Sequence, residues 1–261
     1  MKKIAAIILI LVLGLGLVYV NRVAVRDLIN ELQQPELPAE QTANDFNTNT
    51  EPDDLREKAQ DEAPETPTKA AELPASVNLA VPFTIQAPHQ NWALPYQEAC
   101  EEASLIMAHR FYTGQPLNPD IADEEILKLV AWQEQEFGEY KDTDAPQNVE
   151  ILQRYFGYKR VELIYDFTAE DIRENLAAGR PVILPAAGRQ LGNPYFTPPG
   201  PFYHMLVIKG YTEDGRFITN DPGTRRGADY VYSAQTIINA AHDWNDGDAE
   251  NGKKVIIIPY R

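Results

Sequence analysis

Hydrophobic and polar positions divide the chain into three stretches of different character. The first is an apolar run of seventeen residues, 4–20, that follows Met1, Lys2 and Lys3. Because a helix rises about 1.5 Å per residue, this run nearly spans a hydrocarbon core of about 30 Å. The pattern therefore predicts a membrane segment at the N-terminus.

Two interpretations fit this segment, a cleaved secretory signal and an uncleaved anchor. Residues 21–26 lack the small-x-small pattern of a cleavage site, and no cysteine stands nearby to accept a lipid. We therefore favour a single-pass anchor over residues 1–29, with secretion after signal cleavage as the alternative. Lys2 and Lys3 favour a cytoplasmic N-terminus, although Arg22 and Arg26 weaken the charge asymmetry. The remainder of the chain is then expected on the extracytoplasmic side of the cell membrane.

The second stretch, residues 30–75, changes abruptly in composition. Six prolines are interleaved with Glu, Asp, Thr, Gln and Ala, and aromatic residues are nearly absent. Acidic residues outnumber basic ones by twelve to three between Glu31 and Ala75. Such a stretch buries too little apolar surface to offset its conformational entropy, and its like charges repel. It is expected to be a disordered linker that holds the following domain away from the bilayer.

From residue 76 onward the apolar positions recur with the periods of regular secondary structure. Helical spacing runs over residues 96–112, 122–137 and 146–156. The second half changes to β-branched and aromatic runs, interrupted by short helices at 169–177 and 234–242. Those runs predict strands at 161–165, 181–186, 204–211, 216–220, 230–232 and 255–259, and Pro82 restricts a further short strand at 79–86 to an edge. This order predicts an α+β domain over residues 76–261.

Composition and charge exclude several classes of function. The net charge of −16 and the lack of a basic stripe argue against nucleic acid as a partner, because phosphate binding needs clustered Lys and Arg. Cys100 is the single cysteine, so neither an intramolecular disulfide nor a CxxC metal motif is available. The histidines show no metal-ligand spacing, and glycine-rich phosphate loops are absent. No cofactor and no metal site is expected.

Four residues carry candidate chemistry: Cys100, His204, Asp221 and Gln86. Cys100 falls in the first turn of a predicted helix, where free amides and the macrodipole favour a thiolate. His204 opens an apolar strand, and Asp221 follows the next one, where it could orient the imidazole. Gln86 could donate its side-chain amide to a developing oxyanion. The order and spacing fit a hydrolase with a cysteine nucleophile built from two halves of the chain.

Each of these residues also has a purely structural interpretation. A cysteine among Ala99, Ala103 and Leu105 suits the buried face of a helix. A histidine at a strand edge needs no catalytic role, and Asp-Pro-Gly at 221–223 is a common turn. The aromatic and proline-rich residues 188–203, which lead into His204, fit either a peptide cleft or a rigid surface loop.

The quoted residues nevertheless resemble one known family. The stretch Val81-Pro-Phe-Thr-Ile-Gln86, the segment Ala99-Cys100-Glu-Glu-Ala103-Ser104, His204 and Asp221-Pro222 are similar to the C39-like peptidases of the papain-like superfamily. The resemblance implies a papain-like α+β fold, with the cysteine helix in a helical first half and an antiparallel sheet in the second. It also implies Cys100 as nucleophile, His204 as general base, Asp221 as orienting acid and Gln86 as oxyanion donor.

One departure from the family pattern concerns the nucleophile. The family usually continues from the cysteine with Gly-Pro, whereas Glu101 and Glu102 follow here. Two carboxylates beside a thiol raise its pKa and oppose formation of the thiolate. A membrane-anchored cysteine peptidase acting on peptides or proteins is the leading hypothesis. A cell-wall amidase or peptidoglycan hydrolase and a catalytically weak peptide-binding domain are the alternatives, and the sequence sets no oligomeric state.

Overall fold

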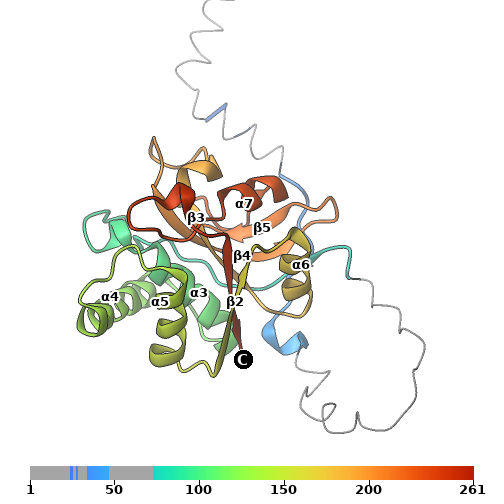
Figure 1. Ribbon diagram of the computed structural model, residues 1–261. Helices are drawn as coiled ribbons and strands as arrows, with labels where there is room; N and C mark the ends of the chain where they lie inside the picture. Colours follow the sequence, from blue (N-terminus) through green and yellow to red (C-terminus); the bar gives the residue numbers. More distant parts are fainter. Residues whose placement is uncertain (1–23, 26–27, 29–33, 47–72) are drawn as a thin grey trace, which may run out of the picture. The chain divides into compact units, whose positions relative to one another are not determined.

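The domain is built around a seven-stranded antiparallel sheet (Figure 1). The computed structural model describes residues 24, 25, 28, 34–46 and 73–261. The strands run in the order β2-β7-β3-β4-β5-β6, and β1 pairs with the far end of β4. Their bounds are β1 Val77–Asn78, β2 Arg160–Tyr165, β3 Val182–Ala187, β4 Tyr203–Tyr211, β5 Phe217–Asn220, β6 Tyr230–Tyr232 and β7 Val255–Tyr260.

The principal helices begin and end at sequence signals. Asn118 caps one helix by accepting a hydrogen bond from the amide of Ile121, and Asp144 and Thr168 each form a capping box. Gly114 and Gly138 close their helices in the left-handed conformation. The helices are α3 Cys100–Thr113, α4 Pro119–Phe137, α5 Ala145–Glu150, which continues as η3 Ile151–Tyr155, α6 Ala169–Ala177 and α7 Ala234–Ala240, with short turns η1 Ala43–Phe46, η2 Tyr96–Glu98, η4 Gly188–Leu191 and η5 Ala249–Asn251.

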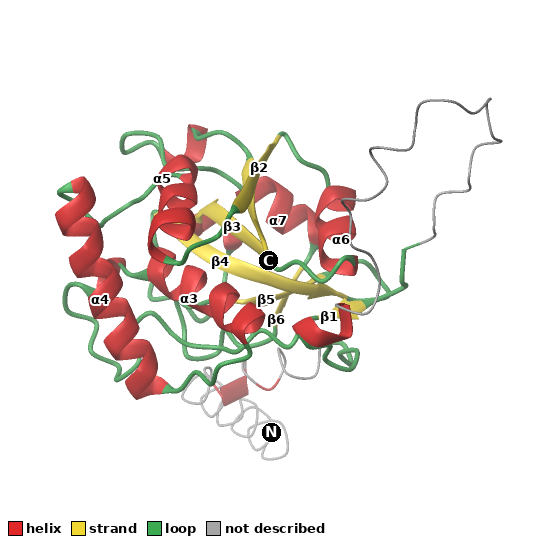
Figure 2. Ribbon diagram, turned by 90° about the horizontal axis from the view of Figure 1, so that it is seen from below, coloured by secondary structure: helices red, strands yellow, loops and turns green. Residues whose placement is uncertain are grey.

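Alternation of side chains along the central strands separates two apolar clusters. In β7, Val255 and Ile257 pack in a cluster with Cys100 and Leu105 of α3, whereas the intervening Ile256 joins a cluster with α6. Successive side chains of a strand point to opposite faces, so both faces of this sheet are covered. Figure 2 shows α3, α4 and α5 together on one side of the domain and α6 on the other. The apolar runs of the central strands β3, β4, β5 and β7 are therefore buried on both faces.

Most of the expected elements are present with boundaries shifted by a few residues. Helix α6 and strand β6 match their expected ranges, and the α+β order with an antiparallel sheet is confirmed. The strand expected over residues 79–86 is wrong. The chain pairs with β4 at Val77–Asn78 and then leaves the sheet, because Pro82 has no amide hydrogen and the carbonyl of Val81 accepts from the Asn220 side chain.

Residues 37–46 differ from the expected linker. The compact unit of the chain begins at Leu37, not near residue 76. The amide of Gln41 donates to the carbonyl of Asn78, and the carbonyl of Gln41 accepts from the amide of Ala80. Glu40 also pairs with the buried ammonium of Lys209. These contacts are made by backbone groups and by one charged side chain. They could not be predicted from the polar composition of the segment.

Two other expectations concern residues outside the description. Residues 47–72 of the expected linker and residues 1–23, which include the expected membrane segment, are not among the described residues. Within the part of the chain that is described, no helix combines the length and apolar character needed to cross a bilayer.

Candidate active site

Cys100 is the first residue of α3 and faces the sheet. Its side chain is 6% exposed and belongs to an apolar cluster that includes Met205 of β4. The preceding residue, Ala99, provides no side-chain cap at the start of α3. The expected position of the cysteine in the first turn is confirmed.

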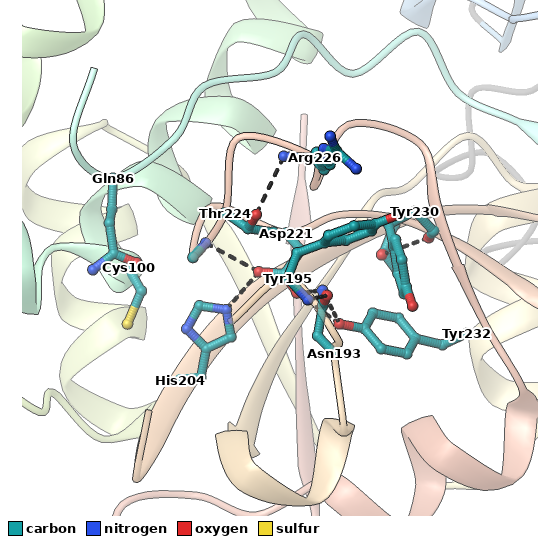
Figure 3. A network of polar contacts seen from close by, with 12 residues as sticks. Gln86, Cys100, Asn193, Tyr195, His204, Asp221, Thr224, Arg226, Tyr230 and Tyr232 are labelled. Carbon is teal, nitrogen blue, oxygen red and sulfur yellow. Dashed lines mark hydrogen bonds and ion pairs between the residues drawn. The ribbon is translucent and has the colours of Figure 1, made fainter. Parts of the chain in front are cut away.

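His204 lies on β4, next to Met205. Its Nε2 lies 2.8 Å from Oδ1 of Asp221, and both side chains are buried. Nδ1 is a buried atom with no hydrogen-bond partner among the described residues. In Figure 3 the imidazole has Asp221 on one side and Cys100 on the other, with Nδ1 directed toward Cys100. The structure therefore brings together the three residues that sequence reasoning selected from α3, β4 and the end of β5.

Asp221 is held by hydrogen-bond donors from several elements. Besides His204, it accepts from Asn193 Nδ2 at 3.0 Å, from the Tyr232 hydroxyl at 2.7 Å and from the amide of Gly223 at 3.0 Å. Burial by itself would raise the pKa of Asp221, but the charge and hydrogen bond of His204 and the hydrogen bonds from Tyr232 and Gly223 lower the pKa below its ordinary value. Asp221 is thus held as a carboxylate in hydrogen-bond contact with the imidazole.

Sequence reasoning missed Asn193 and Tyr232. Asn193 Nδ2 donates to the Tyr232 hydroxyl at 2.8 Å as well as to Asp221, so the three side chains form one buried network (Figure 3). Asn193 sits in the proline-rich loop before β4, and Tyr232 ends a three-residue strand. Neither position carries a motif, because only the pairing of β5 with β6 and the path of the loop bring them to Asp221.

Gln86 lies close to the site, but its amide is engaged elsewhere. Nε2 donates to the carbonyl of Tyr96 at 3.0 Å and to that of Gln97 at 2.8 Å. A flipped amide would set its oxygen against two carbonyl oxygens, so the chemistry fixes this orientation. The backbone amide of Gln86 donates to the carbonyl of Pro222. Gln86 thus ties the turn before Cys100 to the turn after Asp221, and its oxyanion role stays a prediction.

The two glutamates after Cys100 are buried in this structure. The Cys100 thiol donates to Oε2 of Glu101 at 3.0 Å, and Glu102 accepts from Gln133. Burial, the Glu101 charge and hydrogen bond, and the Glu102 charge raise the pKa of Cys100, while the amide of Met205 opposes them. The expected effect of the helix N-terminus is therefore outweighed, because burial and two neighbouring carboxylates both disfavour the thiolate.

The aromatic loop of residues 188–203 contacts the site through Phe196 as well as through Asn193. The ring of Phe196 meets the imidazole of His204 edge to face, with 5.3 Å between centroids. A Cβ added at Gly223 would lie 2.9 Å from both rings, so a side chain at this position would crowd them. The described residues contain no group of three or more His, Cys, Asp or Glu side chains placed to hold a metal ion.

The candidate site thus contains a cysteine at a helix start beside a buried His–Asp pair. Residues 78–247 match the model of the Peptidase_C39 like family, and the chain belongs to this family. The resemblance stated from the sequence is thereby confirmed, and membership supports a peptidase-type function.

Two solved structures are similar to the chain at low identity. One is described as a C39-like peptidase from Bacillus anthracis, with 17% identity over 71% of this chain and 98% of that chain and a TM-score of 0.46. The other is a fragment of Prevotella intermedia prointerpain A, with 15% identity over 64% of this chain and 48% of that chain and a TM-score of 0.36. A search of curated proteins finds no match.

Proposed function

We propose that the protein is a cysteine peptidase that hydrolyses peptide bonds with Cys100, His204 and Asp221. The observation that carries this proposal is the buried contact of 2.8 Å between His204 Nε2 and Asp221, which leaves Nδ1 without a partner and directed toward Cys100. Because Nε2–H donates a hydrogen bond to the carboxylate, the neutral imidazole carries its proton on Nε2, and Nδ1 is left as the acceptor. Family membership supports the same reaction class.

The chemistry follows from this arrangement of the three side chains. The Cys100 thiol passes its proton to Nδ1 of His204, and the resulting thiolate attacks the carbonyl carbon of the scissile peptide bond. The imidazolium then gives that proton to the leaving amine, and a thioester with the acyl part of the substrate remains. Water, deprotonated by Nδ1, cleaves the thioester and restores the thiol.

The uncapped start of α3 supports one further assignment. As the substrate carbonyl becomes tetrahedral, its oxygen gains negative charge close to the first amides of the helix. The backbone amide of Cys100 is the donor nearest the nucleophile in the chain, and a helix N-terminus favours negative charge. We assign this amide as an oxyanion donor, with Gln86 holding the turn that positions it.

The test is hydrolysis of an unfolded protein by the full chain in detergent. Turnover should be lost in Cys100→Ala and in His204→Ala while the circular dichroism spectrum is unchanged. Glu102→Gln is the matched control, because this equally buried neighbour of the site accepts from Gln133 and not from the thiol. Retained hydrolysis in Cys100→Ala would refute the mechanism. Release of muropeptides from purified cell wall, with no cleavage of protein, would instead favour the amidase alternative.

The proposal includes anchoring to the cell membrane, with the domain on the extracytoplasmic side. It is supported by the apolar run of residues 4–20 after two lysines. A chain lacking residues 1–29 should move from the membrane fraction to the soluble fraction. A full chain that is released from membranes by alkaline carbonate would contradict the anchor.

A further inference from the structure

The thiol of Cys100 is hydrogen-bonded to Glu101 and not to His204. Sγ lies 3.0 Å from Oε2 of Glu101, in the geometry of a thiol donating to a carboxylate. Nδ1 of His204, the acceptor that the nucleophile needs, is buried and without a hydrogen-bond partner among the described residues. Two independent observations thus describe one state, in which the nucleophile and its base are neighbours but are not hydrogen-bonded to each other.

Glu101 is itself fixed in place from a different part of the chain. Its other oxygen, Oε1, accepts from the backbone amide of Thr143 at 3.1 Å, and the residue is 1% exposed. Thr143 immediately precedes Asp144, the capping residue of α5. The carboxylate therefore connects the start of α3 to the start of α5. This contact also holds its second oxygen, Oε2, next to the sulfur of Cys100.

The charged and titratable groups around this contact come from α3, β4 and two loops. Glu102 lies on α3, Asp142 lies in the loop before α5, and Tyr203 and His204 lie on β4, with Asp243 beyond Tyr203. Burial, followed by the charge of Glu102, raises the pKa of Glu101 well above the ordinary range of a carboxyl. Glu101 therefore changes its charge at a higher pH than an exposed glutamate does.

We propose that Glu101 is a positioning residue that restrains the nucleophile. Its ionised carboxylate accepts the hydrogen bond of the Cys100 thiol, keeps the proton on sulfur and holds that proton away from Nδ1 of His204. When Glu101 takes up a proton from solvent, it loses the charge that held the thiol, and the thiol proton can then pass to Nδ1. This role rests on the peptidase function proposed above.

The experiment measures alkylation of Cys100 by iodoacetamide against pH, in the full chain. Cys100 is the only cysteine, so the incorporated label reports this thiol alone. In Glu101→Gln the amide oxygen can still accept from Thr143, but the charge beside the sulfur is gone. At the alkaline end of the profile, where Glu101 is ionised, we expect Glu101→Gln to raise the rate about tenfold or more, because one unit of thiol pKa is a factor of ten in thiolate. The rates of wild type and variant should converge in acid, where Glu101 is protonated.

Glu102→Gln is the matched control, since it removes the same charge one residue away. Glu102 is bonded to Gln133 and not to the sulfur, so we expect a rate change of less than about threefold. Equal acceleration in the two variants would mean that net charge, and not the contact, sets the reactivity, and would overturn the proposal. No acceleration in Glu101→Gln would overturn it as well.

Two further measurements keep the proposal testable. In Glu101→Gln combined with His204→Ala the acceleration should disappear, and its persistence would overturn release of the thiol to the imidazole. The S–H stretching band of the wild-type chain, which needs no variant, should shift to higher frequency on acidification as the carboxylate is lost. An unchanged band would contradict the hydrogen bond from the Cys100 thiol to the ionised Glu101 carboxylate. Because neither readout requires turnover, failure of the peptidase function, seen as hydrolysis by Cys100→Ala, is distinguishable from failure of this role.

Discussion

Removing residues 1–75 should destabilise the domain, although the sequence alone places the domain start at residue 76. The perturbation is a chain that begins at Ser76, compared with one that begins at Leu37, where the compact unit starts. The difference between them isolates the contribution of the segment that contains Gln41 and Glu40. Both chains keep Cys100, His204 and Asp221.

The magnitude follows from the contacts that the shorter chain loses. Four hydrogen bonds cross this boundary: Gln41 amide to Asn78 carbonyl at 2.7 Å, Ala80 amide to Gln41 carbonyl at 2.7 Å, Asn78 Nδ2 to Pro38 carbonyl at 3.0 Å, and Tyr211 hydroxyl to Pro74 carbonyl at 2.8 Å. Each contributes about 0.5–1.5 kcal/mol net of water, so the loss of all four costs roughly 2–6 kcal/mol.

The ion pair of Lys209 adds a smaller amount. Nζ lies 2.6 Å from Glu40 and 2.7 Å from Asp229, and the lysine side chain is 2% exposed. Because Glu40 is half exposed and Asp229 remains, losing Glu40 costs about 1 kcal/mol or less. Altogether the free energy of unfolding should fall by roughly 4 kcal/mol, the middle of the range for the hydrogen bonds. A loss of this size lowers the melting temperature by about 8–16 °C for a domain of this size.

The assay is urea unfolding of the two chains, followed by tryptophan fluorescence and by circular dichroism. The chain beginning at Ser76 should unfold at a lower urea concentration, and Glu40→Gln in the longer chain should reproduce only the minor part of the difference. Coincident unfolding curves for the chains beginning at Ser76 and Leu37 would refute the reasoning. The segment would then lie on the domain without stabilising it.

Three shorter predictions concern the site and its neighbours. Tyr232→Phe removes one hydrogen-bond donor from Asp221, so the pKa of Asp221 should rise toward its ordinary value. We expect kcat/KM to fall about threefold to tenfold and the acid limb of its pH profile to move to higher pH. An unchanged pH profile would contradict the role of this hydrogen-bond network. Burial raises the pKa of Glu102 to about 7, so the folded state binds more protons than the unfolded state between about pH 4.5 and 7. The free energy of unfolding should therefore fall as the pH rises through this window. Glu102→Gln should flatten that fall and raise the free energy of unfolding at pH 8 by roughly 1–3 kcal/mol, measured by urea unfolding, and a variant as pH-dependent as wild type would be evidence against it. Gly223→Ala places a methyl group 2.9 Å from the His204 ring, so kcat should fall about a hundredfold. Full activity would show that the ring can move without cost.

Periodicity predicted the elements of the domain well because most of them are amphipathic or fully apolar over several residues. Helix α3 begins at Cys100, and its C-terminus is marked by Gly114. The β4 run from His204 to Tyr211 is apolar enough to predict a buried strand. The strand expected at 79–86 was wrong because a short run with a proline is decided by its partners, and there Asn220 and Pro222 take its backbone groups.

The same limit applies to the candidate site. Residue type and chain order selected Cys100, His204 and Asp221, because thiol chemistry needs a nucleophile, a base and an orienting acid. The distance between His204 and Asp221, and the side of the ring that faces Cys100, depend on pairings between segments far apart in the chain. The amide of Gln86 shows the difference most clearly, since its type suits an oxyanion donor while its position gives it two carbonyl partners.

By itself, the sequence determined the α+β class, the order of the elements and the three residues of the candidate site. Local periodicity and residue chemistry suffice for these, because each is a property of a few neighbouring positions. Only the tertiary structure decided the burial of Glu101 against the thiol, the Asn193–Tyr232 support of Asp221 and the start of the folded unit at Leu37. These depend on contacts between distant segments, where burial turns an ordinary charge or amide into a strong constraint, and no local pattern records them.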